Sequence, residues 1–319
     1  PSWTVTWHRR NIFTDPDVVA AEAEYLRTLA AALADRPNFL GMTVGNEINQ
    51  FSGAPHPDPD PIAPAQAESW LRRMLAACQE GAPDHPHVHA EYDAAWYLDD
   101  HPFTPAQCSR LGAASVIHSW VFNGTAQKYG THSTATGQHA AYLIELSKAF
   151  ADDPHRPVWL QEIGAPVPHI PPAYAADFAE TAITAALDCP DVWGVTWWCS
   201  HDVDRRLADF PELEYSLGLL TNDRTAKDLG RRIAELARAQ PARPKPRTTA
   251  LVIGSPGAGD PAGPPKPSDC APGGPVFEAF MRLTEDGVRP TTVLAERAAD
   301  AEHLAARGIS EVVAPGDVT

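Results

Sequence analysis

Residues 157–164 of the sequence are PVWLQEIG, and residues 39–47 are FLGMTVGNE. Each contains a short apolar run that gives way to a glutamate, which is the pattern of a buried strand followed by a loop. Around them, apolar residues recur at helical spacing over 15–35, 65–80 and 134–151. The sequence therefore predicts strands that alternate with helices.

Further short apolar or alternating runs continue this series along the chain. Strands that alternate with helices indicate an α/β fold with a parallel sheet, either a barrel or a doubly wound sheet. Polar residues stand where several different strands end, and a barrel builds its active site from such strand ends, so we favour the barrel. The predicted strands end near residues 46, 92, 120, 162 and 198.

Two of these strand ends carry a carboxylate. Glu47 ends one strand, and Glu162 ends the strand three steps later. Two carboxyl groups at the mouth of a barrel are the apparatus of glycoside hydrolysis, because one protonates the leaving oxygen and the other attacks the anomeric carbon or activates water. The pair predicts hydrolysis of a sugar bond. The structural alternative is that each glutamate only forms an ion pair at its strand end.

Four segments, in chain order, resemble the strand ends of the retaining glycoside hydrolases of clan A, especially the cellulase- and mannanase-like family 5. They are Gly-Asn-Glu at 45–47, His-Ser-Trp at 118–120, Trp-Leu-Gln-Glu-Ile-Gly at 159–164, and Trp198. The resemblance covers roughly residues 1–240. It implies a (β/α)8 TIM barrel and a glycoside hydrolase activity.

The resemblance also implies roles for single residues. Glu47 matches the general acid/base at the end of the family's fourth strand, and Glu162 matches the nucleophile at the end of the seventh. Asn46 is then expected to bind the sugar 2-hydroxyl. The family's sixth strand carries His-x-Tyr, whereas this chain has Trp120, and an indole can donate a hydrogen bond but cannot accept one.

The aromatic content suits a carbohydrate ligand, since sugar rings stack their apolar faces on flat side chains. The chain has nine tryptophans. Trp197 and Trp198 point to opposite sides of one strand, so at most one faces the barrel interior, and the family pattern selects Trp198. Trp96 and Tyr97 are expected in a loop. The predicted substrate-binding residues are Asn46, His118, Trp120, Trp198, His89 and His201.

A histidine run raises an alternative chemistry. His85, His87 and His89 form a His-x-His-x-His sequence, which together with His118 and Asp202 suggests a barrel metallohydrolase. Such enzymes carry their His-x-His pair on the first strand, whereas this run lies at the fifth. We therefore predict no metal ligands and no requirement for a metal or an organic cofactor.

The position of Glu47 limits how much of a barrel is present. If Glu47 ends the fourth strand, three strand–helix units precede it, yet at roughly 38 residues per unit the upstream residues suffice for one. We expect a barrel that lacks its first two or three strand–helix units, with strands three or four to eight within residues 1–240. The third strand is then Thr4–Trp7 or lies before Pro1, and the chain is expected to be a fragment.

The C-terminal residues predict a second, smaller domain. Residues 241–248 resemble a stiff, proline-containing linker, and 249–319 alternate strand and helix as a partial doubly wound, flavodoxin-like α/β domain. This segment resembles the amidotransferase-like accessory domain of some barrel glycosidases. Cys270 lies in a proline-rich loop, so an active glutaminase is not expected. A structural role, or a homo-oligomer formed through this domain, is expected instead.

Composition excludes several other classes. The net charge of −16 opposes binding to nucleic acid, and no apolar run approaches the 18 residues that a membrane span needs. Five cysteines without a Cys-x-x-Cys spacing argue against a disulfide framework or a structural zinc site. The sequence leaves open whether the protein is cytoplasmic or secreted.

Together these features predict a retaining β-glycosidase that hydrolyses β-linked hexosides of the mannan or glucan type by a two-carboxylate double displacement. Its partner would be a β-linked oligo- or polysaccharide. One alternative is a non-catalytic relative that binds carbohydrate without turning it over, and the other is the metallohydrolase. The sequence does not identify the sugar, the linkage, or endo against exo cleavage.

Overall fold

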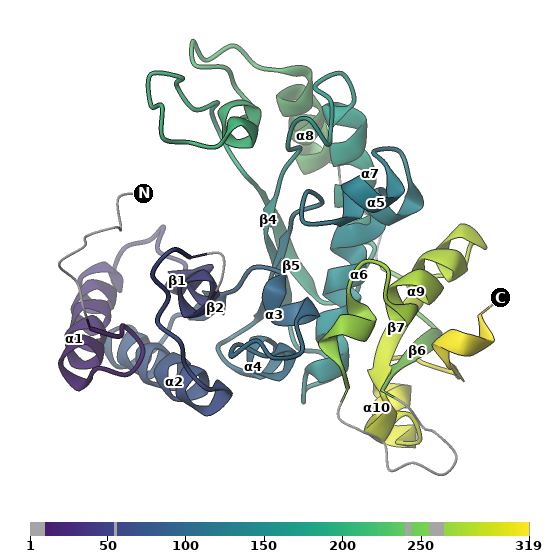
Figure 1. Cartoon of the computed structure of the whole chain (residues 1–319), viewed down its shortest axis with the longest axis horizontal. Helices are drawn as coiled ribbons and strands as arrows, with labels where there is room; N and C mark the ends of the chain where they lie inside the picture. Colours follow the sequence, from purple (N-terminus) through teal and green to yellow (C-terminus); the bar gives the residue numbers. More distant parts are fainter. Residues whose placement is uncertain (1–9, 54–55, 240–243, 255–264, 319) are drawn as a thin grey trace. The chain divides into compact units, whose positions relative to one another are not determined.

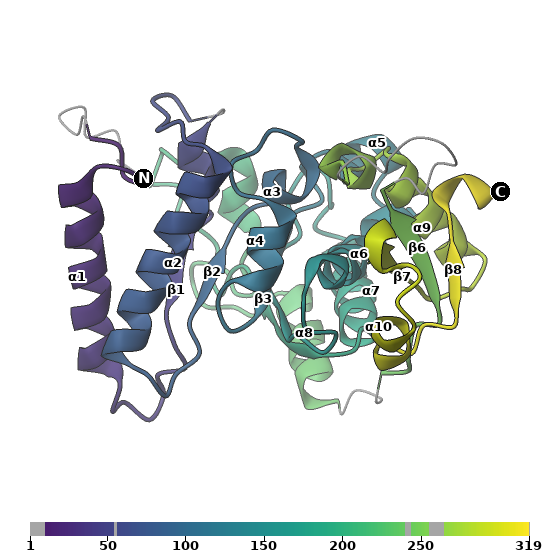
Figure 2. The ribbon, with the colours of Figure 1, turned by 90° about the horizontal axis from the view of Figure 1, so that it is seen from below.

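The computed structural model describes residues 10–53, 56–239, 244–254 and 265–318 (Figure 1, Figure 2). They belong to two compact units, residues 1–116 and 117–319, which we describe separately. The predicted strand Thr4–Trp7 lies outside the described residues.

The first unit pairs two long helices with two short parallel strands. Helix α1 (Pro16–Leu33) packs on α2 (Pro64–Gly81), and both have proline in the first turn, where the missing N–H costs nothing. Strand β1 (Thr43–Asn46) pairs in parallel with β2 (Val88–Ala90). The 3₁₀ turn η1 (Ile48–Ser52) follows β1, and the short helices α3 (Ala94–Tyr97) and α4 (Pro105–Arg110) follow β2.

The second unit contains a three-stranded sheet in the order β3-β4-β5. Its strands are β3 (Ser115–Ser119), which begins just before the unit boundary, β4 (Val158–Ile163) and β5 (Val192–Trp197), and β4 and β5 run parallel. Its helices are α5 (Thr125–Tyr129), α6 (Thr134–Phe150), α7 (Ala175–Leu187) and α8 (Asp228–Arg238). The 3₁₀ turn η2 (Glu212–Ser216) lies in the long connection from β5 to α8.

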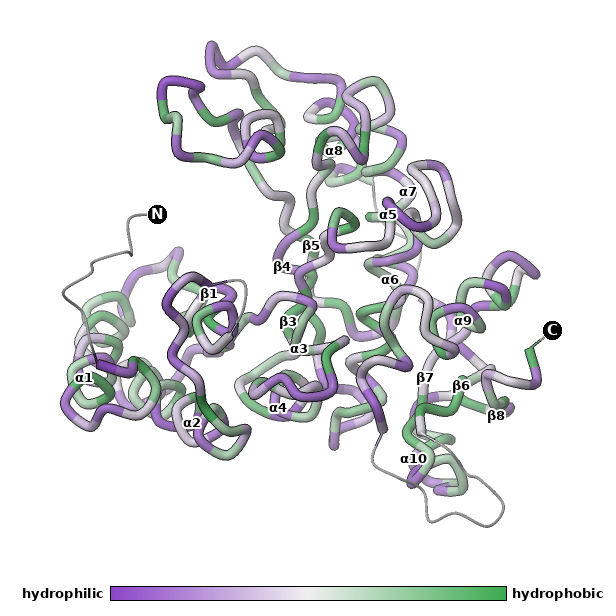
Figure 3. The backbone as a smooth tube through the Cα atoms, viewed as in Figure 1, coloured by the Kyte–Doolittle hydropathy of each residue, from purple (hydrophilic) through white to green (hydrophobic). Residues whose placement is uncertain are grey.

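The C-terminal part of the second unit has its own parallel sheet, in the order β7-β6-β8. Its strands are β6 (Thr249–Ile253), β7 (Pro290–Leu294) and β8 (Glu311–Val313), with helices α9 (Pro275–Glu285) and α10 (Ala301–Ala306). The central strand β6 is buried at every residue and shows largely the hydrophobic colour in Figure 3. This sheet therefore has a core of its own.

Helix α6 packs between the two sheets of the second unit (Figure 1). It contacts β4 on one side and β7 on the other, and nearly all of its residues are buried. Tyr142 packs edge-on against Phe277 and Phe280, and its hydroxyl donates to the carbonyl of Cys270 at 2.6 Å. Cys270 is thus buried in a packing contact.

Most predicted elements are present, with shorter ends. The strand expected over 39–45 begins only at Thr43, because the amide of Met42 donates to the His87 ring instead of continuing a ladder. Trp96 and Tyr97, expected in a loop, lie in helix α3 and are buried. A helix of four residues is too short to show a periodic pattern, so the sequence could not reveal it.

Five strands, β1 to β5, lie within residues 10–53 and 56–239. The expectations that the barrel lacks its first units, and that domains meet at 240 and 249, stay predictions. Among the described helices, none is long and apolar enough to cross a bilayer.

A buried ion-pair cluster joins α6 to the C-terminal part. Glu145 of α6 accepts from Lys148 at 2.8 Å and from the Thr291 hydroxyl at 2.6 Å, and the Arg247 guanidinium lies 3.5 Å away. Burial raises the pKa of Glu145, but the two cations and the hydrogen bonds together outweigh it and lower the pKa to about 2. Arg247, expected in a polar linker, is itself buried.

We predict that Glu145→Gln destabilises the protein by about 3–5 kcal/mol, because Lys148 and Arg247 then stay buried without their counter-charge. Thermal or urea unfolding measures the change. The control is Glu68→Gln on α2, whose carboxylate pairs with Arg72 in an exposed i,i+4 bridge and is expected to cost at most about 0.5 kcal/mol. Equal losses in the two variants would contradict the prediction.

The same cluster sets a dependence on pH. Because the folded pKa of Glu145 lies near 2, below its usual 4.5, its stabilisation is complete above about pH 4.5 and is lost as the pH falls toward 2. We predict that unfolding midpoints of the wild type fall across this window and that Glu145→Gln flattens the fall. If the unfolding midpoint of the variant falls with pH as steeply as that of the wild type, other carboxylates cause the pH dependence.

Candidate active site

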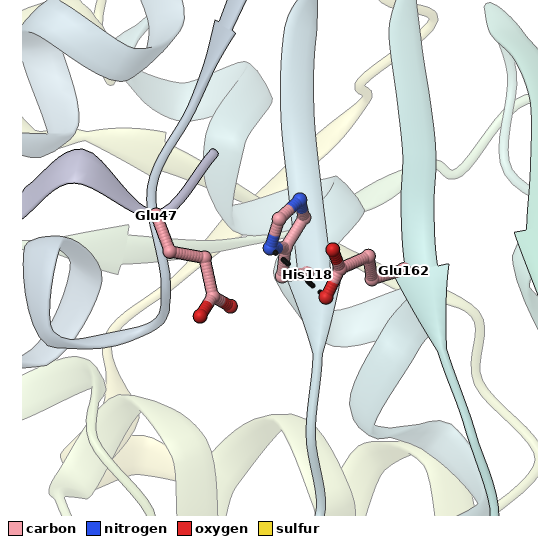
Figure 4. Close-up of side chains that lie close together, drawn as sticks. All are labelled: Glu47, His118 and Glu162. Carbon is pink, nitrogen blue, oxygen red and sulfur yellow. Dashed lines mark ion pairs between the residues drawn. The ribbon is translucent and has the colours of Figure 1, made fainter. Parts of the chain in front are cut away.

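Glu162 lies at the end of β4 with its carboxylate almost enclosed, since the residue is only 8% exposed. The Trp120 indole Nε1–H donates to Glu162 Oε2 at 3.1 Å. His118 Nδ1 lies 3.4 Å from the same oxygen, and Figure 4 shows this pair joined by a dashed line. Both partners come from β3 and the residue just after it, the strand that neighbours β4. The sheet order therefore brings them to the carboxylate.

His118 bridges two acceptors. Its Nε2 is 3.0 Å from Gln161 Oε1, and its Nδ1 faces Glu162. The ring is 1% exposed. It can donate to both oxygens at once only when both nitrogens carry protons, and in that form it provides a positive charge beside the carboxylate. His118, predicted to bind substrate, here contacts protein groups of β4.

Trp120 stands where the resemblance described above implies a tyrosine. Its indole supplies the donor to Glu162 that a tyrosine hydroxyl would supply. The ring is 7% exposed and packs 5.5 Å from Phe122. Because an indole has no lone pair to offer, this contact can only favour the ionised carboxylate.

Gly164 makes room for that indole. A Cβ atom at Gly164 would lie 2.6 Å from Cζ3 of Trp120 and 2.9 Å from the carbonyl oxygen of Trp198. No real Cβ approaches other heavy atoms so closely, so any side chain here must push the Trp120 ring or the backbone after β5. The glycine is required by close packing.

Trp197, the last residue of β5, and Trp198, which follows it, differ in exposure, as alternation along a strand predicts. Trp197 is 9% exposed and donates from Nε1 to the carbonyl of Leu217 at 3.2 Å. Trp198 is 43% exposed, and its Nε1 donates to Glu214 Oε2 at 3.4 Å. Of the two rings, Trp198 is the one available for stacking.

Glu47, labelled in Figure 4, belongs to the first unit and follows β1 directly. Its backbone is left-handed, with φ 50° and ψ 36°, and its amide donates to Ala90 of the paired strand at 2.8 Å. Its carboxylate accepts from the Gln50 side chain. Asn46 beside it is exposed, and Gly45 has φ 61°. Positive φ at Gly45 and Glu47 turns the chain sharply where the strand ends.

The histidine run has structural partners. Both ring nitrogens of His87 contact backbone groups, those of Met42 and Ala82. His89 Nδ1 lies 2.8 Å from the buried Glu91 carboxylate, which Cys108 of α4 also contacts. The Glu91 carboxylate therefore joins His89 of β2 to Cys108 of α4.

The residues after β5 are also engaged. His201 is exposed, with Nδ1 3.1 Å from the Ser200 hydroxyl. Asp202, the aspartate of the metallohydrolase alternative, forms an ion pair with Lys227 at 2.7 Å and accepts from the Gly218 amide. These contacts give Asp202 a structural role in the loop.

Sequence reasoning missed Gly164 as a packing requirement and Glu214 as the partner of Trp198. A glycine directly after a predicted strand hinted at the first. Nothing in the sequence distinguishes Glu214 from Glu212, since the two flank one residue and only the fold selects between them.

We predict that Gly164→Ala lowers kcat/KM by roughly 100-fold, because displacing the Trp120 indole by even 1 Å misplaces the Glu162 carboxylate. Steady-state kinetics measure the loss. The control is Gly194→Ala on β5, where an added Cβ meets nothing within 4 Å. Activity of Gly164→Ala equal to that control would contradict the packing argument.

The chain matches solved structures, but no family model and no curated protein. No model of a protein family matches the chain, and no curated protein matches it. Solved structures do: a variant of GH5_18 from Streptomyces cattleya in complex with Manβ1-4GlcNAc is 71% identical, with a TM-score of 0.94, covering 100% of this chain and 77% of that one.

Two further structures are similar. A variant of GH5_18 from Bifidobacterium longum subsp. longum, also in complex with Manβ1-4GlcNAc, is 44% identical with a TM-score of 0.90, covering 99% of this chain and 74% of that one. An exo-β-1,4-mannosidase from Opitutaceae bacterium strain TAV5 is 20% identical with a TM-score of 0.69, covering 98% and 55%, and indicates the fold alone.

These relatives carry the TIM-barrel-like α/β fold that the strand–helix alternation predicted. With 71% identity over its whole length, the chain belongs to subfamily 18 of glycoside hydrolase family 5 (GH5_18) and is a glycoside hydrolase.

Proposed function

We propose that this chain is a retaining β-mannosidase that releases mannose from Manβ1-4GlcNAc. The observation that carries the proposal is the presence of this disaccharide in complexes of relatives that are 71% and 44% identical. The proposal narrows the hexosides predicted from the sequence, which included glucan as well as mannan.

In this mechanism Glu162 attacks the anomeric carbon, the bond to the leaving oxygen breaks, and a mannosyl ester forms on Glu162. The hydrogen bond from Trp120 supports this role, because a donor to the carboxylate favours its ionised form and fixes its direction, and His118 Nδ1 lies 3.4 Å from the same oxygen. Near-complete burial raises the strength of both contacts.

Glu47 is the proposed acid/base. It donates its proton to the leaving GlcNAc oxygen and then takes a proton from the water that hydrolyses the ester, so mannose leaves with its β configuration retained. Asn46 is proposed to bind the sugar 2-hydroxyl. Its exposed side chain at the end of β1 is compatible with this role.

Trp198 is proposed as the platform under the sugar ring, supported by its exposed indole. Trp120 and His118 are proposed to line the sugar site and to hold the Glu162 carboxylate in place. His201 remains a proposed substrate contact on its exposure. His89 remains a proposed substrate contact: its Nδ1 pairs with Glu91, while its buried Nε2 has no hydrogen-bond partner among the described residues.

Residues 249–319 are proposed to be a flavodoxin-like accessory domain with a structural role. The parallel order β7-β6-β8 and the packing of Phe277 and Phe280 on Tyr142 support it. Cys270, buried with its carbonyl bonded to Tyr142, is consistent with the expected absence of glutaminase chemistry. A homo-oligomer through this part stays a prediction.

We predict that the protein cleaves Manβ1-4GlcNAc and aryl β-mannosides. For the matching β-glucosides and β-galactosides, kcat/KM should be lower by at least about 100-fold. Proton NMR during hydrolysis should show β-mannose as the first product. First release of α-mannose would contradict retention, and equal cleavage of glucosides would contradict the mannose assignment.

The two carboxylates can be assigned separately with an aryl β-mannoside and azide. Glu162→Ala should lose about 10⁴-fold or more in kcat and, with azide, form α-mannosyl azide, because azide replaces the nucleophile with one inversion. Glu47→Ala should form the ester and give β-mannosyl azide. The exposed Glu180→Ala on α7 is the control and should match the wild type.

Other outcomes point elsewhere. If the wild type binds Manβ1-4GlcNAc in calorimetry, and it hydrolyses the aryl β-mannoside no faster than the Glu47 and Glu162 variants do, the chain is the non-catalytic carbohydrate-binding relative. Swapped azide products would exchange the roles of Glu47 and Glu162.

A further inference from the structure

We propose that Glu214 is a positioning residue that holds the Trp198 indole in place for stacking on the sugar, so that it sets substrate affinity rather than the chemical rate. The inference rests on the proposed function in taking a sugar as the ligand of Trp198. The geometric basis is the contact between Trp198 Nε1 and Glu214 Oε2 at 3.4 Å.

The exposed ring needs such a partner. Trp198 is 43% exposed, so packing fixes only part of its surface. Stacking on a sugar requires one ring orientation, and a side chain that is ordered before binding loses less entropy when the ligand arrives. A hydrogen bond from the indole to a carboxylate is charge-assisted and therefore stronger than one to a neutral acceptor.

Glu214 is carried by a segment that is fixed to the end of β5. The 3₁₀ turn η2 leads into Leu217, whose carbonyl accepts from the buried Trp197 indole at 3.2 Å and from the Cys199 amide at 3.4 Å. Leu219 then donates back to Cys199 at 3.0 Å. The two adjacent tryptophans are thus bonded to the same short segment, Trp197 through a backbone carbonyl and Trp198 through a carboxylate.

Two further contacts hold this segment. Lys227 Nζ donates to the Ser216 carbonyl at 2.8 Å and to Asp202 at 2.7 Å. At Gly218 any Cβ would overlap the backbone of His201 and Asp202, so the segment can approach the strand end only with glycine there. Glu214 therefore starts from a fixed backbone, which a positioning residue requires.

The neighbouring Glu212 provides a matched control. It lies on the same 3₁₀ turn, and its carboxylate forms a two-bond ion pair with Arg205, at 2.6 and 3.1 Å. The two residues differ in partner while sharing charge, turn and sequence neighbourhood. A change that follows Glu214 and not Glu212 is then due to contacts that Glu214 alone makes, and a double-mutant cycle with Trp198 isolates the contact with the indole.

The experiment compares Glu214→Ala, Glu214→Gln and Glu212→Ala in the full chain. With Manβ1-4GlcNAc, Glu214→Ala should raise KM about 5–10-fold with kcat within about 2-fold. Glu214→Gln keeps an acceptor for the indole and should stay within about 2-fold in both constants. Glu212→Ala should match the wild type. A fall in kcat at constant KM, or equal effects at 212 and 214, would overturn the proposal.

A double-mutant cycle tests the dependence on Trp198 directly. If Glu214 acts through the indole, Trp198→Ala alone and Trp198→Ala with Glu214→Ala should have the same KM, because the second change has nothing left to position. Additive losses would overturn the proposal by showing that Glu214 acts without Trp198.

A readout without turnover separates this inference from the proposed function. The Trp198 Nε1–H resonance in a ¹⁵N-labelled protein should shift in Glu214→Ala and stay in place in Glu212→Ala. If the wild type cleaves no β-mannoside, the proposed substrate is wrong, while the resonance still decides whether Glu214 holds the ring. An unmoved resonance in Glu214→Ala overturns the inference whatever the activity.

Discussion

The hydrogen bond from the Trp120 indole to Glu162 is the contact on which the candidate site depends. A carboxylate that is 8% exposed is costly to bury without partners; Trp120 donates a hydrogen bond to it, and the His118 ring lies 3.4 Å from the same oxygen. The contact exists because Gly164 leaves space for the indole ring. One missing side chain thus permits the orientation of the proposed nucleophile.

The second unit also contains a buried carboxylate that is stabilised by its partners. Helix α6 faces apolar groups on both sides, and its polar residue Glu145 is tolerated there because Lys148, Arg247 and Thr291 bond to it. A helix buried on both faces can support the sheet that carries Glu162 and also receive the C-terminal sheet. Stability and the position of the site are therefore linked through one helix.

Much of the fold followed from local pattern. Apolar residues at helical spacing over 15–35 predicted α1, and the apolar runs before Asn46 and Gln161 predicted β1 and β4. Each of these elements buries residues that are close together in the sequence, so its apolar spacing can be read there. Helix α3 escaped prediction because four residues are too few to show a periodic pattern. The late start of β1 also escaped prediction, because it reflects the contact of Met42 with His87, which is far away in the sequence.

The sequence by itself determined the strand–helix series and the two glutamates that follow strands, since strand periodicity and the chemistry of carboxylates are properties of neighbouring residues. Only the tertiary structure decided that the Trp120 indole donates to Glu162, that Gly164 must stay small, and that Glu214 rather than Glu212 contacts Trp198. These are distances between segments far apart in the chain, and packing in three dimensions sets them.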